Sequence, residues 1–150
     1  MSNRIALLAF ILLTVGGGLL IGVATAPGDW YAGLQKPPFN PPNWLFGPVW
    51  TVLYILIAIA GWRIWRRDPH GAAMKFWIAQ IALNFIWSPL FFSAHLPGAA
   101  FVVIIALLVV ILALIMLTLD RERVSAWLLV PYALWVAFAA LLNASIWWLN

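Results

Sequence analysis

Three apolar segments carry aromatic and amide side chains at steps of three and four residues, so each set shares one face of a helix. The sets are Gly47, Trp50 and Tyr54; Gln80, Asn84, Trp87, Ser88, Phe91 and His95; and Pro131, Trp135, Ala139 and Asn143. Amides among apolar residues require hydrogen-bond partners, so these faces should point inward and towards one another. Indole rings with a few amides would line a cavity suited to a flat, largely apolar ligand.

Two explanations compete for these side chains. Hydrogen bonds between packed helices explain Gln80 and Asn143 as well as a ligand cavity does. A cavity is the better explanation for a second group, which consists of Trp50, Asn84, Trp87 and Trp135. Small residues, Gly47 and Ala139, stand beside the large aromatic ones and leave room between the helices.

Groups that could perform acid–base, nucleophilic or metal chemistry are scarce. The chain has no cysteine, which excludes thiolate catalysis and sulfur-ligated metals. No Ser-His-Asp set, paired carboxylate or glycine-rich phosphate loop occurs. His70 and His95 fall at opposite ends of the apolar segments, so they cannot share a metal, and no metal site is predicted. His95 alone could ligate a haem iron, although a capping or interfacial role explains it more simply.

The elements that position these residues follow from composition. Of the 150 residues, 66% are hydrophobic and 8% are charged, and the mean hydropathy is +1.04. No soluble domain of this length can hide so much apolar surface. We therefore predict an all-α membrane protein, a single transmembrane domain (1–150) in which five helices form a bundle. The spans are expected at about 5–26, 43–65, 72–94, 99–119 and 124–148, with Asn43 as the N-cap of the second span and Pro89 as a kink in the third.

The first apolar run has a second interpretation. Arg4 precedes it and Ala24-Thr25-Ala26 follows, which is also the pattern of a cleavable signal peptide. Its length of about 20 residues and the spacing of Gly18 and Gly22 favour a retained helix that packs closely against a neighbour. The fourth segment is almost uniformly aliphatic, and we expect it to face lipid.

A proline-rich loop joins the first two helices. The stretch from Trp30 to Trp50 contains five prolines and two glycines, which prevent regular structure, together with six aromatic residues. So much aromatic surface is unusual for a solvated linker. We predict that this loop forms a lid on the cavity, and the residues expected in the lid are Trp30, Lys36, Pro37, Pro41 and Pro42.

The distribution of positive charge predicts the orientation in the membrane. Seven of the eight Lys and Arg residues fall on the side of the N-terminus, and only Lys36 falls on the other. This count places the N-terminus in the cytoplasm and the proline-rich loop and the C-terminus outside, which in a bacterial cell membrane is the periplasm. Eight tryptophans then lie near the two membrane interfaces, where aromatic residues form belts: Trp30, Trp44, Trp62, Trp65, Trp77, Trp127, Trp147 and Trp148.

The sequence resembles the tryptophan-rich sensory protein / translocator protein family, whose mitochondrial member is the peripheral benzodiazepine receptor. The first matching motif consists of Trp30-Tyr31, Leu34, Lys36-Pro37, Pro41-Pro42, Trp44, Trp50 and Leu53-Tyr54. The other two are Ala79-Gln80, Asn84, Trp87-Ser88-Pro89 and Phe91-Phe92, and Val130-Pro131-Tyr132, Trp135, Ala139 and Leu142-Asn143. The resemblance covers nearly the whole chain in order.

The resemblance implies a homodimeric bundle of five helices that binds porphyrins, notably protoporphyrin IX, and also haem, sterols and isoquinoline- or benzodiazepine-type drugs. The positions that match the family's ligand contacts are Tyr31, Trp50, Tyr54, Asn84, Trp87, Trp135 and Ala139. Bacterial members are linked to tetrapyrrole regulation, stress signalling and light-dependent degradation of protoporphyrin. That degradation is attributed to the tryptophans that match Trp50 and Trp135.

The sequence also departs from the family pattern. Ala32 stands where many members carry Asp, and Pro38 where some carry an aromatic residue, so the lid should make fewer polar contacts. Ala144, Ser145 and Trp148 occupy the region of the cholesterol motif, and we expect no strong cholesterol recognition through it.

We expect an integral membrane protein that binds and senses tetrapyrroles, with porphyrin or haem as ligand and no obligatory cofactor. The expected partners are membrane lipid, the tetrapyrrole, a sterol and a second copy of the chain. Nucleic acid is not among them, because the excess of Lys and Arg in a membrane protein indicates its orientation in the membrane sooner than nucleic-acid binding. Two alternatives stay open: photo-oxidative degradation of protoporphyrin, with Trp50 and Trp135 as the reactive residues, and transport of porphyrin or lipid. Transport is disfavoured because no charged residue lies within a span and inverted repeats are absent.

Overall fold

The structure of the chain is a computed structural model that describes residues 2–150, all of them in helices or their connections. Within residues 2–150, five helical segments are long and apolar enough to cross a membrane: Asn3–Ala24, Asn43–Arg67, Ala72–Ser93, Pro97–Thr118 and Arg123–Leu149. The predicted all-α fold with five spans is therefore confirmed, and the ends differ from the expected ones by a few residues.

Seven α-helices and two short π-helices make up these spans and the first loop. They are α1 (Asn3–Ile11), η1 (Leu12–Gly16), α2 (Gly17–Ala24), α3 (Asp29–Ala32), α4 (Asn43–Arg67), α5 (Ala72–Ser88), η2 (Pro89–Ser93), α6 (Pro97–Thr118) and α7 (Arg123–Leu149). The first span consists of α1, η1 and α2, and the third consists of α5 and η2.

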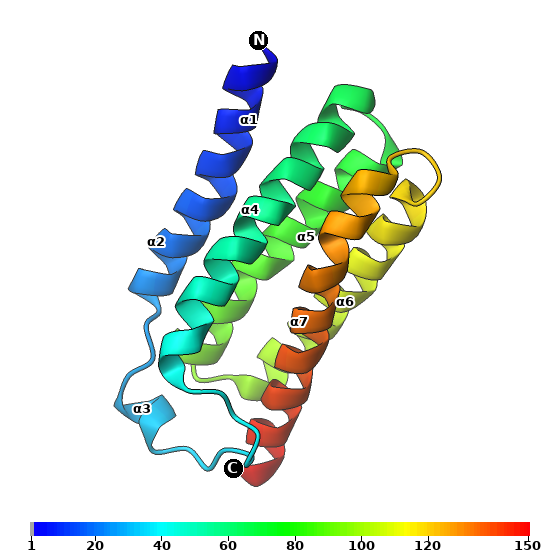
Figure 1. Cartoon of the computed structure of the whole chain (residues 1–150). Coiled ribbons are helices and arrows are strands. Elements are labelled where there is room, and N and C mark those ends of the chain that lie inside the picture. The colour runs from blue at the N-terminus through cyan, green and yellow to red at the C-terminus, as the bar shows by residue number, and fades with distance from the viewer. Residues whose placement is uncertain (1) are drawn as a thin grey trace.

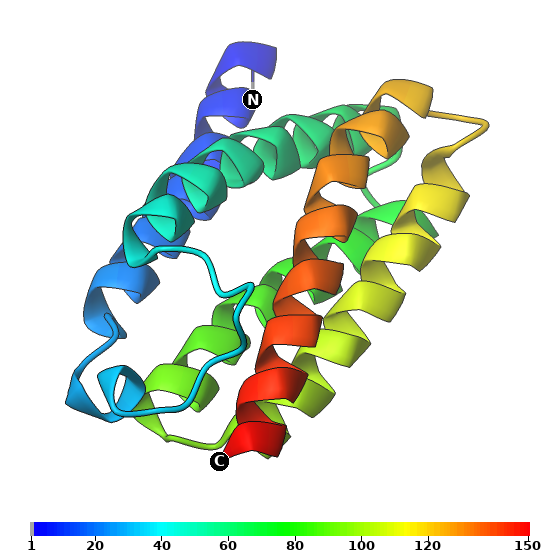
Figure 2. The same cartoon turned by 60° about the horizontal axis from the view of Figure 1, so that its bottom comes forward.

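Four spans run side by side along the molecule, and the first span lies against their edge (Figure 1). α6 packs between α5 and α7, α7 also packs on α4, and α1 packs on α4. The connection from α3 to α4 crosses the end of the bundle, reaches the end of α7 and returns to the start of α4 (Figure 2). This connection is the proline-rich loop, and it lies on the same end of the bundle as the turn between η2 and α6.

Two details of the helices differ from the sequence-based expectation. Asn43 was expected to cap the second span, but it is the first helical residue, and Pro42 holds the cap position in an extended conformation without a capping side chain. Pro89 was expected to kink a continuous helix. Instead α5 ends at Ser88 and the chain continues through the wide turn of η2, which accommodates the missing amide of a proline.

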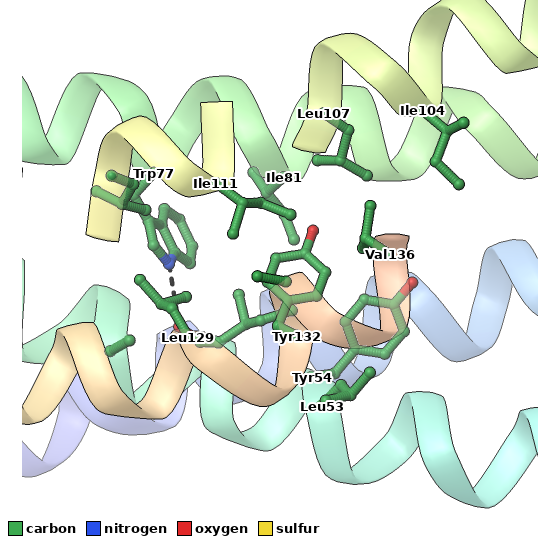
Figure 3. Packing of buried hydrophobic residues seen from close by; sticks show 14 of the residues in the cluster. Leu53, Tyr54, Trp77, Ile81, Ile104, Leu107, Ile111, Leu129, Tyr132 and Val136 are labelled. Carbon is green, nitrogen blue, oxygen red and sulfur yellow. Dashed lines mark hydrogen bonds between the residues drawn. The ribbon is translucent and has the colours of Figure 1, made fainter. Parts of the chain in front are cut away.

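The core lies between α4, α5, α6 and α7 (Figure 3). Trp77, predicted to lie in the aromatic belt, is instead 1% exposed, and its Nε1 donates to the Ile57 carbonyl at 3.0 Å. The ring lies directly against Gly61, which has no side chain in its way. Lipid tails are as apolar as the core, so close packing of this kind and hydrogen bonds hold such helices together.

The fourth span, α6, was expected to face lipid, and only one side of it is exposed. Residues at three- and four-residue steps are buried against α5 and α7, from Ala100 through Ile104, Leu107 and Ile111 to Leu114. The opposite side of the helix is exposed, with Val102, Val109 and Met116 each more than half accessible. A uniformly aliphatic helix gives no sequence signal for this division, because both sides have the same composition.

The first span is fastened to α4 near the middle of the span. Thr14, inside η1, donates its hydroxyl to the Tyr54 carbonyl at 2.9 Å and is fully buried. One turn further on, Gly18 lies against the Tyr54 ring, so that any side chain there would overlap it. The close packing predicted for Gly18 is confirmed, whereas Gly22 has no neighbouring atom within 4 Å of an added Cβ.

We predict that Gly61→Ala destabilises the bundle. An added Cβ would overlap the Trp77 ring, which its hydrogen bond to Ile57 holds in place, and overpacking of this kind costs about 1–3 kcal/mol. The measurement is thermal unfolding in detergent, followed by circular dichroism. Gly16→Ala is the matched control, because nothing lies within 4 Å of a Cβ at that position. Equal melting temperatures for the two variants would contradict the prediction.

Candidate functional site

A cavity of about 680 Å³ lies beneath the proline-rich loop, between α2, α4, α5 and α7. It is lined mainly by apolar and aromatic side chains, and none of the lining residues carries a charge. All seven residues that were predicted to contact a ligand line this cavity: Tyr31, Trp50, Tyr54, Asn84, Trp87, Trp135 and Ala139. Helices α3, α4, α5 and α7 therefore bring these side chains, far apart in the sequence, to one place.

A chain of hydrogen bonds forms the floor of the cavity. The Tyr54 hydroxyl donates to Asn84 Oδ1 at 2.8 Å, and Asn84 Nδ2 donates to the Tyr132 hydroxyl at 2.8 Å. Tyr132 in turn donates to Gln80 Oε1 at 2.7 Å, and Gln80 Nε2 ends the chain without a partner. Gln80 and Tyr132 are fully buried, and Asn84 is 5% exposed. The network holds the Asn84 amide in one orientation and links α4, α5 and α7.

The outer part of the cavity wall is held by a second set of hydrogen bonds. Trp87 Nε1 donates to Asn143 Oδ1 at 2.9 Å, and Asn143 Nδ2 donates to the Pro97 carbonyl at 2.8 Å. The hydroxyls of Thr25 and Ser88 share a hydrogen bond of 2.6 Å, which joins the end of α2 to α5. Asn143 and Gln80 thus make the bonds between helices that were one of two explanations for them, and Asn143 also lines the cavity.

Aromatic rings form most of the wall surface. Trp50 stacks on Tyr54 with ring centroids 5.4 Å apart and an interplanar angle of 29°. Trp87 stacks on Phe91 at 5.5 Å, and Trp135 meets the edge of Phe46 at 5.8 Å. These rings support one another in fixed orientations, which suits the walls of a site for a flat molecule.

Two polar atoms of lining residues have no partner. These atoms are Trp135 Nε1, a donor, and Asn40 Oδ1, an acceptor contributed by the loop. An unpaired buried polar atom costs about 1–3 kcal/mol. A ligand that offered an acceptor to Trp135 or a donor to Asn40 would offset this cost.

The predicted lid residues hold the loop in place and do not line the cavity. Trp30 stacks on His95 with ring centroids 4.3 Å apart, and Lys36 Nζ lies 4.5 Å from the centre of the Tyr31 ring. Pro37 is buried, whereas Pro41 and Pro42 lie at the start of α4, where Pro42 caps the helix. The loop contributes Tyr31 and Asn40 to the lining instead.

Tyr31 connects the loop to the cavity. It is 6% exposed, and its ring meets the edges of Phe91 and Phe92 at 6.3 and 5.3 Å. Burial raises the pKa of the Tyr31 phenol, and the side chain of Asn40 opposes part of this rise. The hydroxyl therefore keeps its proton at neutral pH and can serve as a hydrogen-bond donor.

The loop is also fastened to the end of α7. The backbone amide of Gln35 donates to Asn150 Oδ1 at 3.1 Å, and Asn150 Nδ2 donates back to the Gln35 carbonyl at 2.9 Å. The same Nδ2 also donates to the Ile146 carbonyl at 2.8 Å. No sequence pattern indicated this pairing of residues 115 positions apart.

His95 is exposed and stands in the turn between η2 and α6, with a φ of 57°. Its stacking on Trp30 and its place after a helix end support the capping or interfacial role. Within residues 2–150, no group of three or more His, Cys, Asp or Glu side chains is placed to hold a metal ion.

Tyr132 is the main residue of the site that sequence reasoning left out. The fifth-helix face was expected to include Pro131, but Pro131 is exposed and Tyr132 is fully buried at the centre of the floor network. Tyr132, Val136, Ala139 and Asn143 follow steps of four, three and four residues and are all buried. A search for this mixed spacing, instead of strict steps of four, would have found Tyr132.

The fold and the cavity together define a multi-pass helical membrane protein with an uncharged, aromatic internal site. Comparison with known proteins gives the family: the chain belongs to the TspO/MBR family, whose sequence profile matches residues 10–149. The chain is 42% identical to tryptophan-rich protein TspO of Archaeoglobus fulgidus, covering 99% of both chains. It is 36% identical to the translocator protein of Ovis aries (92% of this chain, 86% of the relative). It is 33% identical to the tryptophan-rich sensory protein of Cereibacter sphaeroides (92% and 87%).

We predict that Tyr132→Phe destabilises the protein by about 1–3 kcal/mol, because it leaves Asn84 Nδ2 and Gln80 Oε1 buried without partners. Thermal unfolding in detergent measures the effect. The double variant Tyr132→Phe with Gln80→Leu removes both ends of one bond, so it should lose less than the sum of the two single variants. Strictly additive losses would show that the network does not couple these residues.

Proposed function

We propose that this membrane protein binds a tetrapyrrole, such as protoporphyrin IX or haem, and acts as a sensory or regulatory protein for it. The observation that carries the proposal is the convergence of the seven predicted residues on one cavity, with rings as walls and a phenol–amide network as floor. In this proposal the tetrapyrrole is a ligand, and no obligatory cofactor is part of it.

The size and chemistry of the cavity support a flat, mostly apolar ligand. Its volume of about 680 Å³ falls within the range of roughly 300–1,000 Å³ that is usual for small-molecule sites. The rings of Trp50, Trp87 and Trp135 offer broad faces for stacking, and a few fixed polar groups would set the orientation of the ligand. Sterol- and isoquinoline-type molecules share these properties and are further candidates.

The names of the relatives support a sensory role by analogy. One relative is named a tryptophan-rich sensory protein and another a translocator protein. Function does not follow from the fold alone, so the proposal rests on the cavity, and the name of the sensory relative agrees with it. We further propose a bacterial cell membrane as the location and, as the family resemblance implies, a homodimer. The charge distribution favours an N-terminus in the cytoplasm, with the loop and the end of α7 outside.

We predict that Trp50→Phe together with Trp135→Phe weakens the binding of protoporphyrin IX about tenfold or more. Each smaller ring loses about 1 kcal/mol of stacking and contact, and about 1.4 kcal/mol corresponds to a factor of ten. A titration followed by the porphyrin absorbance measures the affinity. The matched control is Trp44→Phe with Trp148→Phe, which are 71% and 89% exposed and outside the lining. An unchanged affinity in the first double variant would remove the cavity assignment.

Light-dependent degradation of bound protoporphyrin is the second candidate function. The observation that favours it is that two oxidisable indoles, Trp50 and Trp135, line the same cavity. If it occurs, illumination in the presence of oxygen should bleach bound porphyrin faster than free porphyrin in detergent, and the Trp50→Phe and Trp135→Phe variant should lose this difference. Equal bleaching of bound and free porphyrin would rule out catalysis.

A further inference from the structure

The cavity is open to the side, between α2 and α4, at the depth of the membrane. Gly22 of α2 and Gly47 of α4 both line it, both are exposed, and neither has an atom within 4 Å of an added Cβ. Leu19 and Val23, on the same helix as Gly22, also line the cavity and are 49% and 79% exposed. These residues face the cavity and the lipid together, so the wall is incomplete here.

The contact between the two helices explains why the opening lies at this level. α2 and α4 touch where Gly18 meets the Tyr54 ring. Gly22 stands one turn beyond this contact and Gly47 two turns beyond it, on helices that run in opposite directions. The two glycines therefore border the same region, and the absence of their side chains leaves a gap there. The other edge of α2 is closed, because Thr25 bonds to Ser88 at 2.6 Å and Gly17 lies against the Phe85 ring.

The part of the cavity that lies under the loop is covered, and the exposed lining residues at this end, Ala26, Pro27 and Asn43, stand at the facing ends of α2 and α4, next to Gly22 and Gly47. The loop above the cavity is fastened by the paired hydrogen bonds between Gln35 and Asn150, by the stacking of Trp30 on His95, and by the buried Pro37. Passage beneath the loop would require several of these contacts to break together, whereas the opening beside Gly22 requires none.

From these observations we infer that the ligand reaches the cavity sideways from the bilayer, through a portal between Gly22 and Gly47. This inference rests on the proposed function. It adds that the ligand enters from the lipid bilayer and not from water. Gly22 lies two residues from the end of α2 and Gly47 four residues from the start of α4, or about 3 and 6 Å along the helices. The portal thus stands where hydrocarbon meets the headgroups. It selects flat amphiphilic molecules that dissolve in the membrane with rings in the hydrocarbon and polar groups at its surface.

The test compares a blocked portal with a blocked loop, in protein reconstituted into phosphatidylcholine vesicles. Gly22→Phe with Gly47→Phe fills the portal, and Gly16→Phe is the control, since Gly16 is equally open but does not line the cavity. The loop is clamped separately by Gln35→Cys and Asn150→Cys joined with a short bismaleimide, which reacts cleanly because the chain has no cysteine of its own. Protoporphyrin IX dissolved in the vesicles is the probe, and stopped-flow quenching of tryptophan fluorescence gives its association and dissociation rates.

If the ligand passes through the portal, the double Phe variant slows both rates about tenfold and Gly16→Phe leaves them unchanged. The protein with the clamped loop still exchanges ligand. Loss of exchange in the clamped protein overturns the inference, as does a double Phe variant that changes only the dissociation rate. Pyrene, a flat apolar molecule, is a second probe for the same variants. Failure of protoporphyrin to bind the unmodified protein counts against the proposed function, and the pyrene rates still decide the portal.

Discussion

The structure depends on the requirement that polar groups inside a membrane protein find partners within the protein. Asn84 meets this requirement at the centre of the bundle, where it accepts from Tyr54 and donates to Tyr132. Because each of the three residues belongs to a different helix, the amide fixes the relative positions of α4, α5 and α7. Tyr54 also fixes the first span, since its ring packs against Gly18 and its backbone carbonyl accepts a hydrogen bond from the Thr14 hydroxyl. The first span is thereby positioned by the same network that forms the cavity floor.

The cavity forms because the helices pack closely around Asn84 and less closely between Asn84 and the loop. Around Asn84 the helices are held by hydrogen bonds and stacked rings. Towards the loop, Gly22, Gly47 and Ala139 take the places of larger side chains, and the helices enclose space. The loop closes this space with rings and prolines, which keep their shape without a regular ladder of hydrogen bonds. Rigid walls, a polar floor and a stiff cover therefore arise from a few side chains at defined levels of the bundle.

The sequence predicts the fold and much of the cavity because hydropathy and helical spacing act locally. Five apolar segments and faces built on Asn84, Trp87 and Trp135 can be read directly from the chain. The position of Trp77 could not be predicted, because a tryptophan near a span end suits either an interface or a gap beside a glycine, and only the neighbouring helix decides. The pairing of Gln35 with Asn150 was missed for a related reason: it joins the backbone of an irregular loop to a distant side chain, and neither leaves a periodic signal.

The uncharged lining of the cavity has a consequence for what its occupancy can report. No acidic or basic side chain of the wall needs to gain or lose a proton, or to exchange an ion, when the ring system of a ligand enters. The wall therefore gives the membrane potential and the proton gradient nothing to act on. Under the proposed function, any response of the site to pH or to the membrane potential would have to come from the carboxylates of the ligand. The wall itself would act as a passive gauge of ligand concentration.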